Sequence, residues 1–431
     1  MCVSTHKERH PFDTFTTLTL KPSDCKIFLQ YGTDVIANFE NNKNGGPLHV
    51  LTVIGTRPEA IKLAPVIQRL GLEEGVQSYV CLTGQHRDIV NPILKLFGLE
   101  ADFDLRVMRN GQDLTDITQR ILLGMRKLFS THAFDLVLVH GDTTSGFAAA
   151  LSAFYARIPV AHIEAGLRTG SLDAPWPEEG NRSLIGRLAK LHFSPTEQAR
   201  QNLLREGVPD QAIFVTGNTV VDALYQIRAR IDQHRNLKVR LARRYSFLQD
   251  HCKMILVTGH RRENFGDGLK QICYAIKRLA QRDGVQVVYP VHPNPLVRDP
   301  VHRLLAGTPN VFLVEPLDYP DFVYLMDRCY FVLTDSGGVQ EEAPCMGRPV
   351  LVMREKTERP EGLRAGVTRL VGTDPELIVR ESERLLSSRR VYQAMCKAPT
   401  LYGSGNASEL IVGSIVEHRG RVKLAAGQLV S

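Results

Sequence analysis

The sequence lacks several features that would narrow its function at once. No apolar run approaches the ~20 residues needed to cross a bilayer, and no apolar segment of a secretory signal follows the charged stretch Met1–Arg9. No G-x-G-x-x-G follows an expected strand, and no G-x-x-x-x-G-K-[ST] loop is present. These absences argue against membrane insertion, dinucleotide binding of the usual kind and a P-loop, and they predict a cytoplasmic protein without a cofactor.

Paired cysteines are also missing. The eight cysteines form no C-x-x-C motif and none lies beside histidines at zinc spacing. Several lie in apolar runs, where a thiol packs as a small hydrophobic side chain. The sequence therefore predicts free cysteines in a reducing compartment and no metal site.

A concentrated basic patch is absent as well. The chain has 431 residues, of which 43% are hydrophobic and 23% charged, as in a globular protein of two or three domains. Its net charge of +7 comes from scattered residues, and the densest cluster, Arg240 to Arg244, indicates a solvated helix face. The charge predicts no nucleic-acid partner and is compatible with an anionic small-molecule substrate.

Residues 1–46 differ from the rest of the chain. Their periodicity is weak and they end in a polar run, so we expect a loosely ordered extension with at most a short strand at Lys26 to Tyr31. From Pro47 on, apolar strands alternate with turns and helices. We predict strands at Leu48 to Ile54, Gln77 to Leu82, Asp135 to Val139, Pro159 to Ile163, His192 to Ser194, Ile213 to Thr216, Met254 to Thr258, Val285 to Pro290, Val311 to Val314, Phe331 to Thr334 and Pro349 to Val352.

This pattern predicts an α/β fold of two Rossmann-like, doubly wound parallel-sheet domains that face a cleft. The predicted limits are 47–220 and 221–400, followed by a segment 401–431 with a last helix from about Ala407. Ligands of such sheets bind beyond the carboxyl ends of the strands. The residues that follow each strand are therefore the candidates for a site.

The first expected strand is followed by a turn rich in candidate anion ligands. Gly55 permits a tight turn, and Pro58 suits the first turn of a helix. Arg57 and Lys62 then lie near a helix N-terminus, where anions are favoured. The alternative is a surface turn with solvated charges.

Carboxylates follow three further segments of the first domain. Asp142 precedes a helix, where it could act only as a cap. Glu164 ends a buried strand, where a carboxylate is costly unless it is paired or used, and Arg168 is a candidate partner. Glu178 and Glu179 follow the only tryptophan and could simply complement a helix dipole.

Two turns of the second domain suggest a phosphate site. The turn after Thr258 holds His260 among arginines, and the turn after Thr334 contains Ser336-Gly337-Gly338 ahead of a helix. Glu342, one turn further on, is placed to accept hydrogen bonds from ribose hydroxyls. The alternatives are an exposed basic turn and a glycine-rich turn with a capped helix.

Together these motifs resemble a known family. G-T-R-P-E-A-I-K, H-G-D-T-T, E-A-G-L-R-T-G, P-W-P-E-E, T-G-H-R-R-E-N-F, D-S-G-G-V-Q-E-E-A-P and T-E-R-P-E occur in order between about Leu48 and about Val416. They closely resemble the non-hydrolysing bacterial UDP-N-acetylglucosamine (UDP-GlcNAc) 2-epimerases. The resemblance implies the GT-B architecture, in which the final helix crosses back onto the first domain.

The resemblance also implies roles for particular residues. It implies catalytic roles for Asp142, Glu164 and Glu178, supported by Lys62 and His260. Implied substrate contacts are Arg57, Lys62, Asp142, Glu164, His260, Phe322, Ser336, Gly337, Gly338, Glu342 and Arg359, with Phe322 near the uracil. Gln85, His86 and Arg87 resemble a stretch that helps some members bind a second UDP-GlcNAc as an activator.

Three departures from the family pattern are visible. Residues 1–46 have no counterpart, and Gly180 and Gly84 stand where alanine is common. The change at 180 could loosen the loop beside the Glu pair, and the change at 84 weakens the inference of an activator site.

The expected reaction is reversible inversion at C2, which converts UDP-GlcNAc to UDP-N-acetylmannosamine (UDP-ManNAc) through elimination and re-addition of UDP. The resemblance implies a homodimer that supplies ManNAc units for cell-surface polysaccharide. Alternatives are a GT-B glycosyltransferase, a hydrolysing epimerase that releases free ManNAc, and a catalytically inactive UDP-sugar sensor.

Overall fold

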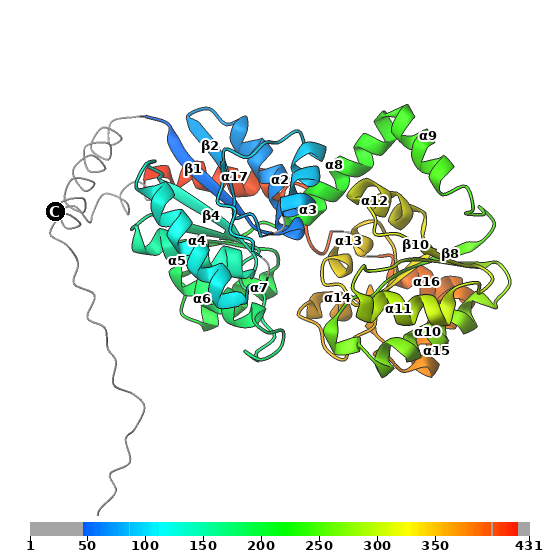
Figure 1. Ribbon diagram of the computed structural model, residues 1–431. Helices are drawn as coiled ribbons and strands as arrows, with labels where there is room; N and C mark the ends of the chain where they lie inside the picture. Colours follow the sequence, from blue (N-terminus) through cyan, green and yellow to red (C-terminus); the bar gives the residue numbers. More distant parts are fainter. Residues whose placement is uncertain (1–45, 86, 110, 398–399, 421–431) are drawn as a thin grey trace, which may run out of the picture.

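Two α/β domains lie side by side in the computed structural model, which describes residues 46–85, 87–109, 111–397 and 400–420 (Figure 1). Each domain is built on one parallel sheet with helices packed against it. The predicted extension 1–46, apart from Gly46, and its expected short strand lie outside the described residues.

The first sheet has seven strands in the order β3-β2-β1-β4-β5-β6-β7. They are β1 (Leu48–Ile54), β2 (Val76–Leu82), β3 (Phe103–Asp104), β4 (Leu136–His140), β5 (Val160–Ile163), β6 (Leu191–Ser194) and β7 (Ile213–Val215). The strand order reverses between β1 and β4, the point at which doubly wound sheets bind ligands. Both central strands are almost wholly buried, which explains their continuous apolar sequence.

Helices cover both faces of this sheet. They are α2 (Arg57–Gly71), α3 (Arg87–Leu96), α4 (Leu114–Phe129), α5 (Thr144–Tyr155), α6 (Glu178–Leu188) and α7 (Glu197–Arg205). Helices α4, α5 and α6 pack against one another in a row, and α2 packs against α3.

The second sheet has six strands in the order β10-β9-β8-β11-β12-β13. They are β8 (Lys253–Thr258), β9 (Val285–Pro290), β10 (Val311–Val314), β11 (Phe331–Thr334), β12 (Val350–Val352) and β13 (Thr368–Leu370). The helices of this region are α9 (Arg235–Arg244), α10 (Asp267–Ala280), α11 (Pro295–Leu305), α12 (Tyr319–Arg328), α13 (Val339–Cys345), α14 (Pro360–Arg364), α15 (Pro375–Ser387) and α16 (Arg389–Met395).

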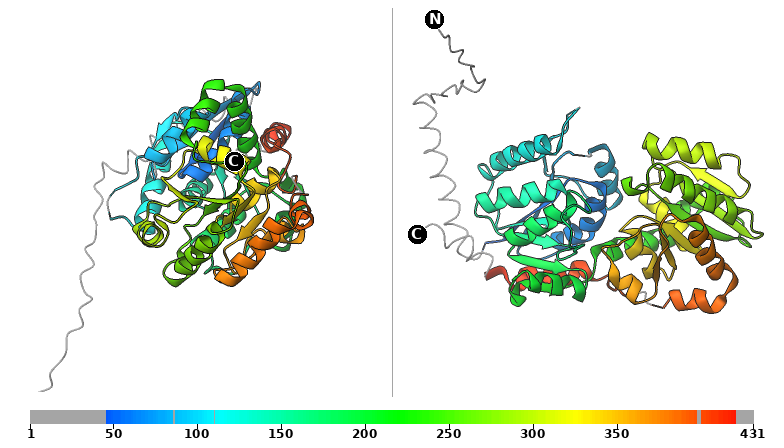
Figure 2. Two further views of the ribbon diagram at one scale, coloured as in Figure 1. Left: turned by 90° about the vertical axis from the view of Figure 1, so that its right-hand side faces the viewer. Right: turned by 90° about the horizontal axis from the view of Figure 1, so that it is seen from below.

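One helix joins the two domains. Helix α8 (Thr219–Gln233) packs against α2 of the first domain and against α12 and α13 of the second. After α16 the chain returns, and α17 (Ala407–Glu417) packs against α2 and α8 (Figure 2). Because apolar residues from α8 and from both sheets form one continuous buried cluster, the domains share part of their core.

The predicted fold class is confirmed, and every strand predicted from Leu48 onward is present with ends shifted by no more than a residue. The short edge strands β3 and β13 were missed, because their sequences Phe-Asp and Thr-Arg-Leu contain a charged residue and form no continuous apolar run. The boundary predicted after residue 220 falls within the first turn of α8 and stays a prediction.

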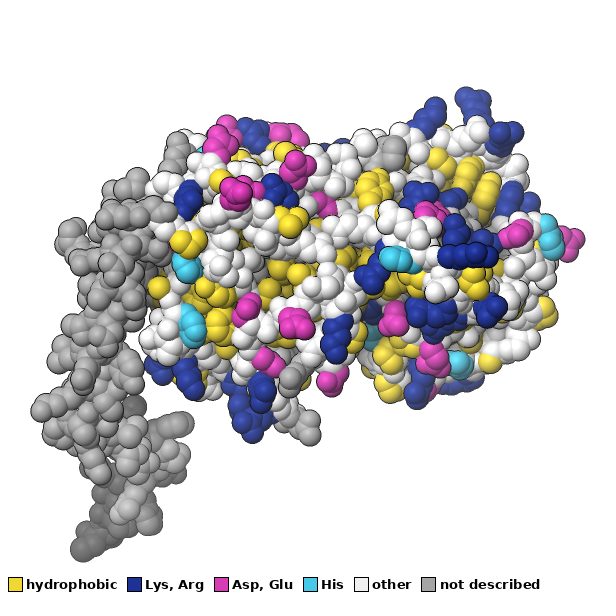
Figure 3. All heavy atoms as spheres, turned by 90° about the horizontal axis from the view of Figure 1, so that it is seen from above, with side chains coloured by type: hydrophobic (Ala, Val, Ile, Leu, Met, Phe, Trp, Pro, Cys, Tyr) yellow, Lys and Arg dark blue, Asp and Glu magenta, His cyan; other side chains and the backbone are white. Residues whose placement is uncertain are grey.

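The surface agrees with the scattered charge of the sequence. On the face seen in Figure 3, lysine and arginine side chains lie over both domains, with acidic side chains among them. The six described cysteines are free thiols, and four are buried, as their apolar surroundings predict. Within the described ranges, no helix combines the length and apolar character needed to cross a membrane.

Candidate functional site

A cavity of about 520 Å³ lies between the domains, at the carboxyl ends of the central strands. This volume lies within the usual range for small-molecule sites. The cavity collects every residue predicted for substrate binding or catalysis. These are Arg57, Lys62, Asp142, Glu164, Glu178, His260, Phe322, Ser336, Gly337, Gly338, Glu342 and Arg359. Their individual roles stay predictions.

The turn from β1 into α2 is held by a buried carboxylate. Glu59 Oε2 accepts hydrogen bonds from the backbone N–H of Gly55 at 2.9 Å and of Thr56 at 2.7 Å. Pro58 lies in the first helical turn, as predicted. Gly55 has no positive φ, and glycine is needed here because a Cβ would lie 2.2 Å from Ser145 Oγ.

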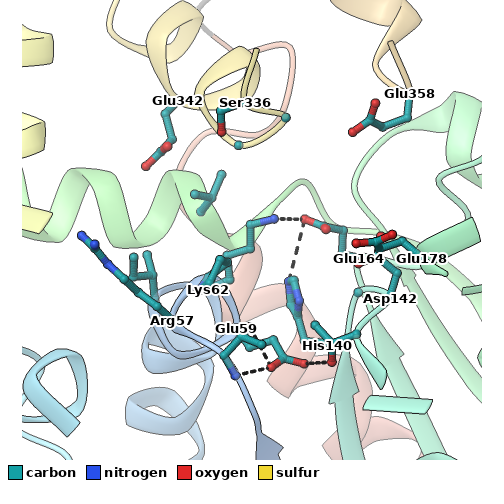
Figure 4. A pocket seen from close by; sticks show the side chains of 18 of the residues that line it. Arg57, Glu59, Lys62, His140, Asp142, Glu164, Glu178, Ser336, Glu342 and Glu358 are labelled. Atoms are coloured by element: carbon teal, nitrogen blue, oxygen red, sulfur yellow. Dashed lines mark hydrogen bonds and ion pairs between the residues drawn. The ribbon is translucent and has the colours of Figure 1, made fainter. Parts of the chain in front are cut away.

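Arg57 and Lys62, on α2, reach across the cavity floor in different directions (Figure 4). Arg57 Nη2 donates to the carbonyl oxygen of Leu317 in the second domain at 2.8 Å. Lys62 donates to Glu164 Oε2, and its Nζ lies 4.0 Å from Glu341 Oε2. The simple alternative of a solvated surface turn is therefore wrong, because both cations join other elements of the site.

Glu164 is a buried, ionised carboxylate. Burial alone would raise the pKa of Glu164, but Lys62, followed by His140 and Arg359, holds it well below its usual value. Burial would likewise lower the pKa of Lys62, yet Glu164 and Glu341 keep it raised. The backbone of Glu164 has φ +62°, a left-handed conformation that is uncommon outside glycine and asparagine.

The pairing of Glu164 with Arg168, considered from the sequence, was wrong. Arg168 Nε instead donates to Glu206 Oε1 at 2.7 Å. The sequence could not reveal this partner, because Glu206 lies 38 residues from Arg168 and only the fold brings the two side chains together.

Asp142 lies in the turn between β4 and α5. Its Oδ2 accepts a hydrogen bond from the buried guanidinium of Arg182, and its side chain is 25% exposed toward the cavity. The cap of α5 is Thr143, whose Oγ1 accepts from Gly146 N at 2.9 Å. The capping interpretation of Asp142 was therefore wrong, and the aspartate is available to the cavity.

The two glutamates at the start of α6 have different surroundings. Glu179 is buried, accepts from the backbone N–H groups of Thr169 at 2.9 Å and Gly170 at 3.1 Å, and pairs with Arg182. Glu178 is only partly buried and lines the cavity beside Asp142 and Glu164 (Figure 4). Glu179 is thus structural, whereas Glu178 is placed to meet a ligand.

The second domain presents His260 to the cavity. The buried carboxylate of Asp335 accepts from the backbone N–H groups of His260 and Arg261, each at 2.9 Å, and so shapes this turn. The His260 ring stacks on that of His292, with centroids 5.6 Å apart. Partial burial lowers the pKa of His260 below 6.5, with Asp335 acting in the opposite direction. The ring is therefore mostly neutral at pH 7 in the free protein.

The Ser336-Gly337-Gly338 turn lies on the same wall. A Cβ at Gly337 would lie 2.9 Å from both Arg359 Nη1 and Glu358 Oε1, so a larger residue would displace this charged pair. Arg359 Nε donates to Glu341 Oε1 at 2.9 Å. Glycine is thus required at 337 by close packing within the protein as well as by any approach of a ligand.

Glu342 is buried beside Tyr319, whose hydroxyl donates to Glu342 Oε1 at 2.8 Å. Burial raises the pKa of Glu342 to about 7, and the bond from Tyr319 offsets only part of this effect. Phe322 lies on α12 with Tyr319, and both aromatic side chains line the cavity.

Several buried residues in and around the cavity were not predicted from the sequence, among them His140, Glu341 and Asp335. His140 Nε2 lies 3.8 Å from Glu164 Oε2 without a hydrogen bond, and burial lowers the pKa of His140 to about 4. Each lies one or two residues from a predicted one, at 142, 342 and 336, but closeness in sequence could not show which side chains turn inward.

The predicted activator stretch is only partly described. Gln85 Oε1 accepts from Ser145 Oγ at 2.7 Å, whereas His86 and the side chain of Arg87 lie outside the described residues. In the part of the chain that the structure describes, no group of three or more His, Cys, Asp or Glu side chains is arranged to hold a metal ion.

Comparisons with known proteins identify the family of this chain. The family model described as UDP-N-acetylglucosamine 2-epimerase matches residues 68–416. A UDP-N-acetylglucosamine 2-epimerase from Yersinia pestis is 53% identical over 373 residues, which cover 86% of this chain and 99% of that relative.

Solved structures give the same result. The UDP-GlcNAc 2-epimerase from Neisseria meningitidis bound to UDP-GlcNAc has a TM-score of 0.83 at 46% identity, covering 86% of this chain and 100% of that one. The enzyme from Methanocaldococcus jannaschii in complex with UDP-GlcNAc and UDP has a TM-score of 0.75 at 30% identity, with coverages of 86% and 100%. The chain therefore belongs to the UDP-N-acetylglucosamine 2-epimerase family.

Proposed function

We propose that this protein is a non-hydrolysing epimerase that interconverts UDP-GlcNAc and UDP-ManNAc by inversion at C2 of the sugar. One observation carries the proposal: three carboxylates of the first domain face, across one cavity, a wall of the second domain that is suited to a nucleotide diphosphate. Relatives of similar sequence are named for this activity, and one was solved with UDP-GlcNAc bound.

The nucleotide would lie against the second domain. In this proposal Phe322 contacts the uracil and Glu342 the ribose hydroxyls, while His260, Arg57 and the Ser336 turn hold the diphosphate; all of them line the cavity. Micromolar binding needs about 8 kcal/mol, whereas a hydrogen bond to a charged group contributes about 1.5–3 kcal/mol. Several donors from both domains are therefore needed, and binding would favour the closed arrangement.

The sugar would face the carboxylates. Its C2 proton is very weakly acidic because no carbonyl is adjacent, so the C1–O bond must loosen first or in concert. The oxygen of UDP leaves with the bonding pair, a carboxylate takes the C2 proton, and a C1=C2 double bond forms in 2-acetamidoglucal. UDP then adds back to C1 while a proton is delivered to the opposite face of C2, so no atom is gained and no redox change occurs.

The surroundings of the carboxylates suggest separate roles. Glu164 is ion-paired with Lys62 and has a lowered pKa, which makes it a weak base and a good partner for positive charge at C1. We assign Asp142 as the base and Glu178 as the acid, because both are partly exposed to the cavity. Lys62 supports Glu164 through their ion pair, and His260 supports the departing diphosphate.

Two further aspects belong to the same proposal. Exposed Leu123, Phe154, Tyr155 and Leu184 lie on the adjacent helices α4, α5 and α6 and support a homodimer through this face. Light scattering after gel filtration tests this, and a monomeric mass would contradict it. Gln85 to Arg87 remain the proposed activator contacts, tested by whether substrate dependence is sigmoidal.

The free cysteines support a cytoplasmic enzyme, and supply of ManNAc units to cell-surface polysaccharide remains the proposed use of the product.

Proton NMR of the purified protein with UDP-GlcNAc in deuterated buffer tests the reaction. We expect UDP-ManNAc that carries deuterium at C2, formed without addition of a cofactor. Free ManNAc would indicate a hydrolysing epimerase, and no product from UDP-GlcNAc alone would favour a glycosyltransferase or a sensor. Unlabelled UDP-ManNAc would argue for transient oxidation instead.

A further inference from the structure

Asn218 occupies the place where the two connections between the domains meet. Its backbone N–H donates to the carbonyl oxygen of Tyr402 at 2.7 Å. A Cβ at Gly217 would lie 2.9 Å from the Cα of Gly403, so the outgoing and returning chains touch here. Asn218 therefore lies where both connections between the domains come into contact.

The side chain of Asn218 uses all of its polar atoms. Nδ2 donates to Glu164 Oε2 at 2.7 Å and to Glu341 Oε2 at 2.8 Å, while Oδ1 accepts from Val220 N at 3.0 Å. Ionised carboxylates only accept, so the amide must turn its nitrogen toward both glutamates. One NH₂ group thus joins a carboxylate of each domain.

The two carboxylates differ in how firmly they are held. Glu341, on α13, is fully buried and paired with Arg359, so it is a fixed anchor in the second domain. Glu164 has Oε2 bound by Lys62 and Asn218, whereas its Oε1 has no hydrogen-bond partner among the described residues. Because Glu164 also lines the cavity, Oε1 is the oxygen left for a ligand.

We propose that Asn218, anchored by Glu341, is a positioning residue that fixes the rotation of the Glu164 carboxylate and ties it to the closed arrangement of the domains. This inference rests on the proposed function, in which Glu164 acts on the sugar. The left-handed backbone of Glu164 explains why a positioning residue is needed, because a strained residue keeps one orientation only where its surroundings impose it.

The competing explanation is that Asn218 only caps α8, since Oδ1 makes a capping bond. Asn, Asp and Ser are nearly equivalent as helix caps. Capping alone therefore predicts that Asn218→Asp and Asn218→Ser behave as the wild type. Positioning predicts failure of both, because neither side chain can donate to the two carboxylates while it caps, and Asp adds a third negative charge.

The test is steady-state kinetics of both variants, together with UDP affinity by calorimetry and thermal unfolding. We expect kcat to fall about 10²-fold for Asn218→Asp and at least about tenfold for Asn218→Ser, with KM and the UDP Kd within about threefold of wild type. The matched control is Asn294→Asp, the same change at the cap of α11, where Oδ1 accepts from Leu296 N at 3.0 Å. We expect it to retain wild-type kcat.

Wild-type kcat in both Asn218 variants would overturn the proposal. So would loss of UDP binding and of thermal stability in parallel with kcat, because that pattern indicates a structural role alone. Glu164→Gln separates this inference from the proposed function. If Glu164→Gln turns over normally, the role of Glu164 itself fails; if it is inactive while the Asn218 variants are active, only the positioning role fails.

Discussion

Lys62 donates a hydrogen bond to the carboxylate of Glu164, which lies 102 residues further along the chain. The side chains are 9% and 7% exposed. Removing one partner of a buried pair leaves an uncompensated charge, which costs far more than the pair itself contributes. The stability of the first domain therefore depends on whether both charges of this pair are present in the site.

Replacing Lys62 by Met should lower the free energy of unfolding by about 3–5 kcal/mol, because Glu164 is left buried and charged. Urea unfolding at neutral pH measures this. The double variant Lys62→Met/Glu164→Gln should recover part of the loss, since no charge is then stranded. The exposed pair Lys238–Asp232 is the control, and Lys238→Met should cost no more than about 1 kcal/mol. Equal losses at both sites would contradict the prediction.

Replacing Asp142 by Asn should abolish most turnover while the fold persists. The amide keeps the size of the side chain but cannot take the C2 proton, and loss of such a group costs about 10²–10⁴ in rate. Epimerisation is followed by NMR and UDP binding by calorimetry. Asp299→Asn, a change at an exposed position on α11, should leave both unchanged. Near-normal turnover of Asp142→Asn would remove this residue from the mechanism.

Glu342 should make stability depend on pH. Its folded pKa, about 7, lies above the value of 4.5 expected when unfolded. Below about pH 4 both states are protonated and the residue has almost no effect. Between pH 4.5 and about 7 the unfolded state ionises while the folded state stays protonated, so stability falls as pH rises; above 7 both states are ionised and the loss is constant. Glu342→Gln should therefore stabilise the protein by about 3 kcal/mol at pH 8 and by nothing at pH 4.

Urea titrations at the two pH values measure this difference. Glu376→Gln, at a side chain that is 71% exposed and paired with Arg278, is the control, and its effect on stability should be no more than about 1 kcal/mol at either pH. A pH-independent effect of Glu342→Gln would show that Glu342 has an ordinary pKa in the folded protein.

His260 should make substrate affinity depend on pH. Its pKa is below 6.5 in the free protein, and a bound diphosphate would raise it, so binding takes up a proton between the two values. Affinity for UDP-GlcNAc should therefore rise as pH falls from 8 to 6, by at most about tenfold per unit. Calorimetry on the inactive Asp142→Asn variant measures this without turnover.

His260→Gln keeps a hydrogen-bond donor but cannot titrate, so its affinity should be nearly flat over the same range. A slope that survives in His260→Gln would assign the proton to another group, of which the stacked His292 is the nearest candidate.

The strand pattern was readable from sequence because buried parallel strands are short, continuous and apolar. The position of the site followed from it, since parallel strands place their carboxyl ends at one edge. Thus Asp142, Glu164 and His260 could all be predicted to face the cleft, and the structure brings them to one cavity.

The hydrogen-bond and ion-pair partners of these residues could not be predicted from the sequence. Arg168 was considered for Glu164 and in fact binds Glu206, and Asp142 was considered as a cap that Thr143 provides. Sequence spacing limits which side chains lie near one another along an element, but it does not fix their rotamers or the side chains that arrive from elsewhere.

The sequence by itself determined the two parallel sheets and the edge at which the candidate site residues gather, because hydrophobic periodicity and turn chemistry are local. Only the tertiary structure decided which charges neutralise one another inside the cleft. Lys62 on α2 and Asn218 ahead of α8 both donate to Glu164, and Asn218 also donates to Glu341 on α13. Such contacts depend on how two domains pack, and in a buried site that packing sets the charge of each group.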